Sequence, residues 1–267
     1  MLKRKIAFIV ACCILLGSLL LLFSTLLPEP LSYQPLTLTS HNDYDYQNLN
    51  QESQFYSYQD ANYQSAILID VSEHNGNIDF AKVKSQGIDF IYLRLGWRGY
   101  TEGKIYLDRR FEEYYRSAAA NGFKIGCYFF SQAIDEAEAI AEASFLLENI
   151  QGKHFQLPIA YDYEDTDEEL GRIKELTLEE KTANAAAFLK TITAAGYQGI
   201  IYANLNWLNN SYDPALLSQY PIWLAQYAKQ PQYQNSFAIW QYSDSGIVEG
   251  IENPVDLNLL FIPKEAQ

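Results

Sequence analysis

Leu157-Pro-Ile-Ala-Tyr-Asp-Tyr-Glu-Asp165 is an apolar run that ends in acids, and the rest of the chain is interpreted around it. The part from Leu157 to Tyr161 is typical of a buried strand. Asp162 and Glu164 follow at the C-terminal end of that strand. Side chains at positions i and i+2 of a strand point to the same face, so we expect the two carboxyl groups to lie side by side, with Cα atoms roughly 6–7 Å apart.

Two carboxyl groups this close disfavour joint ionisation, so the pKa of one should rise. A carboxyl group that keeps its proton beside an ionised carboxylate is the pair of groups that glycosidases use to cleave a glycosidic bond. The alternative is that Asp162 and Glu164 merely end a strand in solvent, because Asp-x-Glu is a common triplet. The remainder of the sequence has to decide between these interpretations.

Short apolar runs alternate with helical patterns from residue 66 onward. Helices are predicted over 79–86, 108–121, 135–150 and 178–195, and at most a turn or two over 214–219. Strands are predicted at Ala66–Ile69, Phe90–Leu95, Lys124–Phe130, Leu157–Tyr161, Gly199–Ala203, Pro221–Ala225, Phe237–Tyr242 and Val255–Leu259. Eight strands, the first five alternating with helices, favour an α/β fold with a TIM-like barrel of mainly parallel strands. An open doubly wound sheet is the rival fold, but no G-x-G-x-x-G follows the first strand to support a dinucleotide site.

Acids and aromatic residues gather at the predicted strand ends, where barrels of this kind place their active sites. The acids are Asp70, Asp162, Glu164 and Asp256, and the other residues include Arg94, Tyr128, Tyr202, Trp223, Trp240, Gln241 and Tyr242. Each has a structural alternative: the aromatic side chains could fill the core, and Arg94 could form a salt bridge in the barrel mouth. Asp70 could cap a turn or helix, and Asp256 could form an Asx turn.

The N-terminus predicts a membrane anchor. Lys3, Arg4 and Lys5 precede an uncharged apolar run from Ile6 to Leu27, which is about the length that spans a bilayer. Basic residues stay on the cytoplasmic side, so residues 1–27 should be an uncleaved transmembrane anchor with the rest of the chain outside the cell. A cleaved signal peptide and lipidation at Cys12 are the alternatives. Residues 28–64 are polar and are interpreted as a linker whose tyrosines could dock, and residues 65–267 as the barrel domain.

Composition excludes some partners. The net charge of −14 argues against nucleic acid, whose binders carry basic patches. Cys127 is the only cysteine beyond the apolar run, so no disulfide can form within the domain. His41, His74 and His154 are scattered, without zinc-ligand spacing, and we expect neither a metal nor a cofactor.

The sequence from about Ile67 to Phe261 resembles the family 25 glycoside hydrolases, the lysozymes that cut bacterial peptidoglycan. The landmarks occur in the family's order: Ile69-Asp-Val-Ser72, Asn75-Gly-Asn-Ile-Asp79, Tyr128-Phe-Phe130, Tyr161-Asp-Tyr-Glu-Asp165, Ile201-Tyr202, Trp223, Trp240-Gln-Tyr242 and Val255-Asp256. The resemblance implies five β/α units followed by three strands. It also implies hydrolysis of the β-1,4 bond between N-acetylmuramic acid and N-acetylglucosamine, with the muramic sugar on the glycone side.

By the same resemblance, Glu164 is the general acid and Asp162 the neighbouring acid. Asp70 and Asp256 are the further acids at the ends of the first and last strands. Tyr128, Tyr202, Trp223, Trp240 and Tyr242 fall where the family lines its substrate groove. One departure is the loop Arg94–Gly103, in which the acid, Glu102, lies further along than in many members.

Three mechanisms stay open from the sequence: attack by the substrate's own 2-acetamido group with Asp162 orienting it, a covalent nucleophile, and an inverting path. A chitinase-like barrel is disfavoured, because residues 157–161 lack the acids of D-x-x-D-x-D-x-E. The alternative from another functional class is a non-catalytic, membrane-tethered wall-binding protein on the same barrel. We expect the partner to be the glycan strands of peptidoglycan, and the location to be the bacterial cell membrane with the barrel outside.

Overall fold

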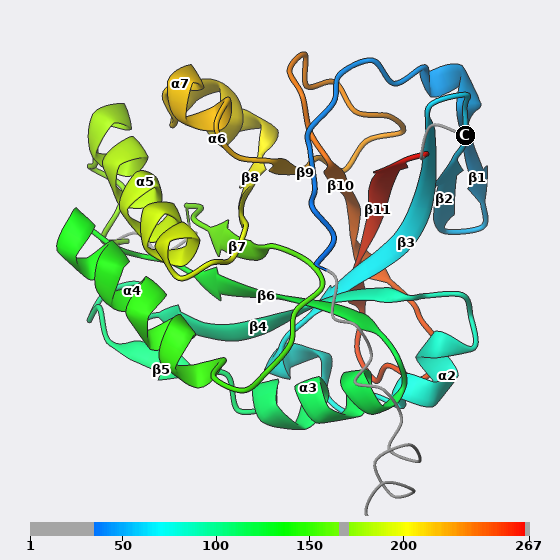
Figure 1. Cartoon of the computed structure of the whole chain (residues 1–267), viewed down its shortest axis with the longest axis horizontal. Helices are drawn as coiled ribbons and strands as arrows, with labels where there is room; N and C mark the ends of the chain where they lie inside the picture. The colour runs from blue at the N-terminus through cyan, green and yellow to red at the C-terminus, as the bar shows by residue number, and fades with distance from the viewer. Residues whose placement is uncertain (1–34, 166–170, 265–267) are drawn as a thin grey trace, which may run out of the picture. The chain divides into compact units, whose positions relative to one another are not determined.

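The computed structural model describes residues 35–165 and 171–264, which form one compact unit (Figure 1). The predicted anchor over residues 1–27 lies outside the described residues. Among the helices that are described, none is long and apolar enough to cross a membrane.

Eight strands close into a barrel, as predicted. They are β3 (Tyr63–Val71), β4 (Phe90–Arg98), β6 (Lys124–Phe130), β7 (Ile159–Asp162), β8 (Gly199–Asn204), β9 (Ile222–Ala225), β10 (Ile239–Gly246) and β11 (Val255–Pro263). Each strand pairs with the next in this order, and β3 pairs with both β4 and β11, which closes the ring. The short strand β5 (Ile105–Leu107) adds an antiparallel edge to β4 and was not predicted.

The last strand runs against its neighbours. Strands β3 to β10 of the barrel are parallel, whereas β11 is antiparallel to both β10 and β3. Asp256 therefore lies near the start of its strand, not at the C-terminal end where we placed it. The reversal brings it to the same rim, because it pairs in register with Asp70 at the end of β3.

Helices cover the outside of the parallel part of the barrel. They are α2 (Phe80–Lys84), α3 (Phe111–Ala120), α4 (Glu136–Asn149), α5 (Leu178–Ala194), α6 (Leu205–Asn210) and α7 (Pro214–Leu217), with 3-10 turns η1 (Tyr46–Asn48) and η2 (Glu73–Asn75). Figure 1 shows the long helices α4 and α5 side by side on one flank, while the last strands have no long helices. This gives the five β/α units followed by three strands that the resemblance implied.

Strand alternation separates two apolar cores. Ile69 and Val71 of β3 face outward and pack in the layer beneath the helices. Leu68, the residue before Ile69, faces the barrel interior, where it joins Tyr92, Ala160 and other inward side chains. Because neighbours in a strand point to opposite faces, Asp70 shares the inward face with Leu68.

Residues 35–64 are not a free linker, which corrects part of our interpretation. Strands β1 (Leu49–Glu52) and β2 (Phe55–Tyr58) form a hairpin. The tyrosines of this segment do dock: Tyr44 stacks on Phe261 with ring centroids 4.1 Å apart, and Tyr56 packs against Trp240 at 5.1 Å.

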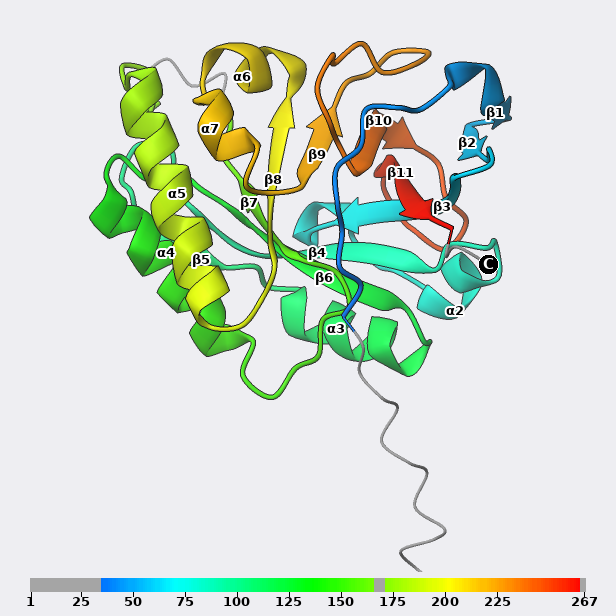
Figure 2. The ribbon, with the colours of Figure 1, turned by 45° about the horizontal axis from the view of Figure 1, so that its top comes forward.

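The stretch before the hairpin closes the end of the barrel opposite the strand C-termini. Leu38 is only 4% exposed and packs in the inner core. Figure 2 shows this blue segment running across the strands. Its residues 36–41 bond in turn to Gln156, Gln198, Ile222 and Phe237, which precede or begin strands β7, β8, β9 and β10. We call residues 35–41 the strap.

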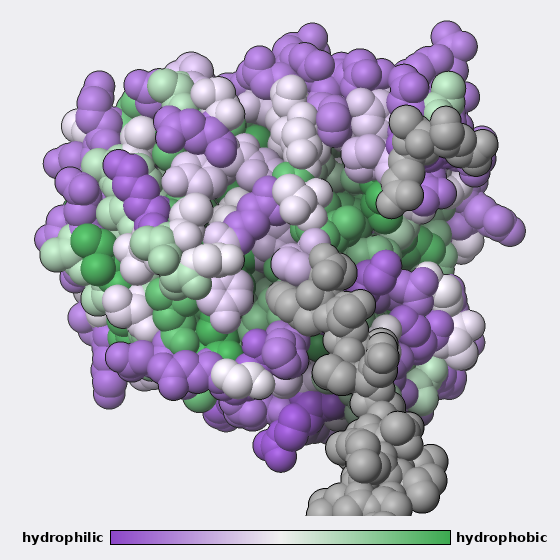
Figure 3. Space-filling model, in the orientation of Figure 1, coloured by the Kyte–Doolittle hydropathy of each residue, from purple (hydrophilic) through white to green (hydrophobic). Residues whose placement is uncertain are grey.

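Polar residues dominate the face of the molecule that Figure 3 shows. In the space-filling view, hydrophilic side chains line the outline of the molecule and hydrophobic ones appear between them in smaller areas (Figure 3). This agrees with a core held inside and around the barrel.

Candidate active site

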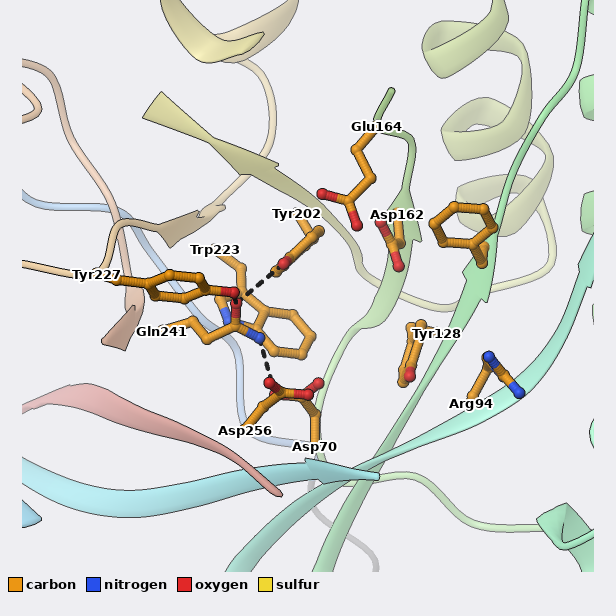
Figure 4. Close-up of a pocket in the computed structure, with 11 residues that line it drawn as sticks. Asp70, Arg94, Tyr128, Asp162, Glu164, Tyr202, Trp223, Tyr227, Gln241 and Asp256 are labelled. Carbon is orange, nitrogen blue, oxygen red and sulfur yellow. Dashed lines mark hydrogen bonds between the residues drawn. The ribbon is translucent and has the colours of Figure 1, made fainter. Parts of the chain in front are cut away.

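A pocket of about 220 Å³ opens where the parallel strands end. The structure brings together here the four predicted acids and three of the five predicted aromatic residues. The lining residues are Asp70, Arg94, Tyr128, Phe130, Asp162, Glu164, Tyr202, Trp223, Tyr227, Gln241 and Asp256 (Figure 4). Convergence at one rim was expected from the strand ends alone.

Asp162 and Glu164 point into the pocket from the end of β7, as the i, i+2 spacing predicts (Figure 4). Burial raises the pKa of Asp162 well above its usual range, and the nearby charges of Glu164 and Asp70 raise it further. Burial, with the charge of Asp70, raises the pKa of Glu164 to about 7. The spacing predicts that the pKa of one of the two carboxyl groups rises, and burial together with the neighbouring carboxylates raises the pKa of both. The pair thus holds a proton near neutral pH.

The backbone around Glu164 is fixed by the segment that follows the neighbouring strand β6. The Gln132 side chain donates to the Glu164 carbonyl oxygen over 3.1 Å, and the Tyr163 hydroxyl donates to the Ala133 carbonyl over 2.7 Å. Tyr163 is fully buried and points away from the pocket. The outward tyrosine therefore anchors the segment that carries the two inward acids.

Asp70 and Asp256 form a second acid pair on another side of the pocket (Figure 4). Burial and the charge of Asp70 raise the pKa of Asp256 to about 9, and the two carboxyl groups share a hydrogen bond. Burial also raises the pKa of Asp70, although Asn258 and Gln241 donate to it and oppose the shift. The Asp70 and Asp256 pair therefore also holds a proton near neutral pH.

A buried amide network holds Asp70, and most of it was missed from the sequence. Asn258 and Gln241 donate to the same oxygen, Asp70 Oδ2, over 2.7 and 3.1 Å. Trp223 Nε1 in turn donates to Asn258 Oδ1 over 2.7 Å, and Tyr202 donates to Gln241 Oε1 over 2.9 Å. Asn258 follows Asp256 by two residues, so strand alternation from that acid could have identified it.

The side chains of Trp223 and Tyr202 therefore line the pocket and donate hydrogen bonds, and neither presents an exposed ring face. Trp223 is 1% exposed and stacks on Tyr92, with centroids 4.5 Å apart. Tyr128 meets the edge of the same indole at 6.5 Å. Trp223 therefore has both of the roles that the sequence left as alternatives: it packs in the core and it lines the pocket.

Arg94 is the cation that lines the pocket. Its Nε donates to Asp108 over 2.9 Å, and its guanidinium lies over the Trp97 ring at 4.7 Å. This is the salt bridge in the barrel mouth that we expected. Arg94 also opposes the rise in the pKa of Asp162.

Trp240 and Tyr242 do not line the pocket, contrary to our expectation from the resemblance. Gln241, between them on β10, points inward, so both neighbours point outward. Trp240 is fully buried against Tyr56 and donates from Nε1 to the Gln226 carbonyl over 2.8 Å. Glu102 of the divergent loop is likewise not among the residues that line the pocket.

No group of three or more His, Cys, Asp or Glu side chains is placed to hold a metal ion within residues 35–165 and 171–264. The four acids interact electrostatically with one another, and Asp70 accepts hydrogen bonds from the amide network. Such a pocket can transfer a proton from a carboxylic acid and stabilise a developing positive charge with a carboxylate.

Comparison with known proteins identifies this barrel. The family model described as glycosyl hydrolases family 25 matches residues 69–251. The autolytic lysozyme of Clostridium acetobutylicum is 29% identical over 191 residues, which are 71% of this chain and 54% of that protein. The chain thus spans about half the length of this curated relative.

Two solved structures share the fold. The family 25 glycosyl hydrolase from Bacillus anthracis superposes with a TM-score of 0.63 at 20% identity, covering 79% of this chain and 94% of that one. The modular autolysin LytC from Streptococcus pneumoniae, solved in complex with a synthetic peptidoglycan ligand, gives a TM-score of 0.63 at 22% identity and covers 73% of this chain and 46% of that one.

Proposed function

Because the chain belongs to family 25 of the glycosyl hydrolases, we propose that it is a lysozyme (N-acetylmuramidase). The substrate is peptidoglycan, and the bond cut is the β-1,4 bond between N-acetylmuramic acid and N-acetylglucosamine. The observation that carries this proposal is the pairing of Glu164 with Asp162 inside a pocket that also holds Asp70 and Asp256.

Glu164 is the general acid. A catalytic acid works best with a pKa near the working pH, and burial raises that of Glu164 to about 7. It gives its proton to the oxygen that leaves the glycone sugar. The sugar then gains oxocarbenium character, which ionised carboxylates in the pocket stabilise.

Asp162 assists from the same strand end. In the path we favour, the 2-acetamido group of the muramic ring attacks its own anomeric carbon, and Asp162 orients the amide and balances its charge. The buried oxygen Asp162 Oδ1 has no hydrogen-bond partner among the described residues, which leaves it free to accept the amide N–H. A covalent nucleophile or an inverting path would use Asp162 or Asp70 differently.

We also propose a location, from the sequence alone. The apolar run at residues 6–27 would tether the enzyme in the bacterial cell membrane with the barrel outside. A tether raises the effective concentration of enzyme at nearby substrate without new contacts. Such an arrangement suits remodelling of the cell's own wall.

The test is hydrolysis of purified peptidoglycan by the full chain and by Glu164→Gln. We expect the wild type to release new reducing groups and Glu164→Gln to lose at least about a hundredfold in rate, since general acid catalysis contributes about 10²–10⁴-fold. Glu148→Gln, at an exposed position of α4, is the matched control and should keep full activity. A Glu164→Gln variant that retains most of its rate would refute the assignment, and binding without any hydrolysis would favour a wall-binding protein.

A further inference from the structure

A largely buried cluster of four charged side chains lies outside the pocket, and the proposed chemistry does not use it. Its members are Arg98 at the end of β4, Glu138 and Glu142 of α4, and Arg172. Arg98 Nε lies 2.6 Å from Glu142 Oε1, and Arg172 Nη2 lies 2.8 Å from Glu138 Oε1. We call these four residues the ion cluster. A buried ion pair is weak evidence for stability, so the contacts of the cluster are the better guide to its role.

Both arginines of the ion cluster bind an acid and backbone carbonyl groups at the same time. Arg172 donates to the two carboxyl oxygens of Glu138 over 2.8 and 2.9 Å, and its Nη1 also donates to the Gln132 carbonyl oxygen over 3.0 Å. Arg98 donates to the Glu138 carbonyl oxygen over 3.0 Å and to the Gly103 carbonyl oxygen over 2.6 Å. A planar guanidinium group makes such bonds in a fixed geometry that a lysine ammonium group does not reproduce. The cluster therefore fixes backbone atoms as well as balancing charge.

The stretch that follows β6, residues 131–134, is held by this cluster along its length. At its start, Ser131 Oγ donates to Glu142 Oε2 over 2.5 Å. At its end, the Ile134 N–H donates to Glu138 Oε2 over 3.1 Å. The bond from the guanidinium group to the carbonyl oxygen of residue 132 lies between these two points. Each bond joins the stretch to a charged group, and such bonds are stronger than bonds between neutral groups.

The same stretch holds the backbone of the two acids that we assign to catalysis. The Ser131 N–H donates to the Asp162 carbonyl oxygen over 2.7 Å, and the Gln132 side chain donates to the Glu164 carbonyl oxygen over 3.1 Å. Both Ser131 and Gln132 are 0% exposed. Arg172 is thus connected to Glu164 through a single residue, Gln132.

The position of Glu164 needs such support. Glu164 lies two residues beyond the end of β7 at Asp162, where the strand pairs with β6 and β8 no longer hold the backbone. A general acid must lie within hydrogen-bond reach of the oxygen that it protonates. A displacement of about 1 Å can cost about a hundredfold in rate. Contacts that fix this backbone therefore bear on the rate of the reaction.

We propose that Arg172 is a positioning residue, which holds Gln132 and through it keeps Glu164 where the acid reaches the glycosidic oxygen. Glu138 orients the Arg172 guanidinium group by binding two of its nitrogen atoms. Arg172 is not among the residues that line the acid pocket, so it acts on the acid and not on the substrate there. This inference rests on the proposed function and deepens it.

The test compares Arg172→Lys, Gln132→Leu and the double variant in the full chain. Lysine keeps the positive charge beside Glu138 but loses the fork that also binds the Gln132 carbonyl oxygen. Leucine removes the donor to Glu164, and the other amide atom, Gln132 Oε1, has no hydrogen-bond partner among the described residues. The matched control is Arg116→Lys, at an exposed position of α3. The substrate is a soluble, uncross-linked tetrasaccharide of alternating N-acetylglucosamine and N-acetylmuramic acid.

We expect each single variant to lower kcat about tenfold and to leave KM within about twofold, because the sugar still binds and only the acid is displaced. Arg116→Lys should keep the wild-type kcat. Because Arg172 acts through Gln132, the double variant should lose about as much as one single variant, and not the roughly hundredfold that independent effects would give. A wild-type kcat in Arg172→Lys would overturn the inference, as would a loss confined to KM or an additive loss in the double variant.

Hydrogen exchange separates this inference from the proposed function. Deuterium uptake by the full chain is measured by mass spectrometry of its peptides for the wild type and for Arg172→Lys. We expect faster uptake in residues 131–134 and 159–165, and unchanged uptake in α3, since the loss of support is local. Unchanged uptake in residues 159–165, or faster uptake throughout the barrel, would overturn the inference. A wild type that cleaves no glycosidic bond would refute the proposed function, and the exchange comparison would still decide whether Arg172 holds this segment.

Discussion

Replacing Glu164 by glutamine should stabilise the protein, and the gain should depend on pH. Glutamine has the same shape and no charge, so it removes the cost of holding a buried carboxylate. Raising the pKa of Glu164 from 4.5 to about 7 corresponds to roughly 3 kcal/mol, at ~1.4 kcal/mol per pKa unit. Because Asp162 shares the same proton, we treat this figure as an upper bound.

The sign follows from which state binds the proton. Between about pH 4.5 and 7 the unfolded chain has released the Glu164 proton while the folded protein keeps it. The stability of the wild type therefore falls as the pH rises through this window, and the loss is complete above pH 7. Glu164→Gln lacks this loss, so its advantage is small at pH 5 and reaches its full value at pH 8.

Thermal unfolding of the full chain at pH 5 and pH 8 measures the effect. For a domain of this size roughly 2–4 °C accompanies each kcal/mol, so we expect Tm of Glu164→Gln to exceed that of the wild type by up to roughly 6–12 °C at pH 8 and by much less at pH 5. Glu148→Gln controls for the removal of one negative charge from a chain of net charge −14. An advantage equal at the two pH values, or a loss at pH 8, would refute the reasoning about Glu164.

Three further changes test the supports of the barrel and the site. Leu38→Ala should destabilise the protein by about 2–5 kcal/mol in urea unfolding, because it empties the closed end of the inner core; a loss below about 1 kcal/mol would mean that the strap is dispensable. Arg98→Met should cost about 3–5 kcal/mol in the same assay, since it leaves the buried Glu142, 2.6 Å from Arg98 Nε, without its counter-charge; a neutral result would show that Glu142 is protonated in the wild type. Asn258→Leu should lower kcat/KM about tenfold with a smaller change in KM, because Asp70 loses a 2.7 Å donor, worth about 1.5 kcal/mol for a charged group; unchanged kinetics would remove Asp70 from the mechanism.

Most of the barrel could be predicted from local patterns. All eight barrel strands were predicted, because each is a short apolar run bounded by turn residues. The direction of β11 could not be predicted, since an apolar run has the same pattern in either direction. Only its pairing with β3 and β10 shows why Asp256, near the start of a strand, reaches the rim.

The wrong predictions in the site concern Trp240 and Tyr242, whose side chains point to the opposite face of the strand from the one expected. The pattern Trp240-Gln241-Tyr242 offers an aromatic or an amide face to the barrel, and nothing in the three residues decides which. The strap and hairpin were missed because their sequence is polar and lacks periodicity. The strap is held by hydrogen bonds to the barrel and the hairpin by aromatic contacts such as Tyr56 on Trp240, and both depend on residues far away in the chain.

The identity of the new sugar ends tests the central claim most directly. The full chain is incubated with purified peptidoglycan, the products are reduced with borohydride, and the reduced ends are identified by mass spectrometry. Reduced N-acetylmuramic acid, absent with Glu164→Gln, is the result we predict. Reduced N-acetylglucosamine would make the protein a glucosaminidase and contradict the account, as would the absence of any new end.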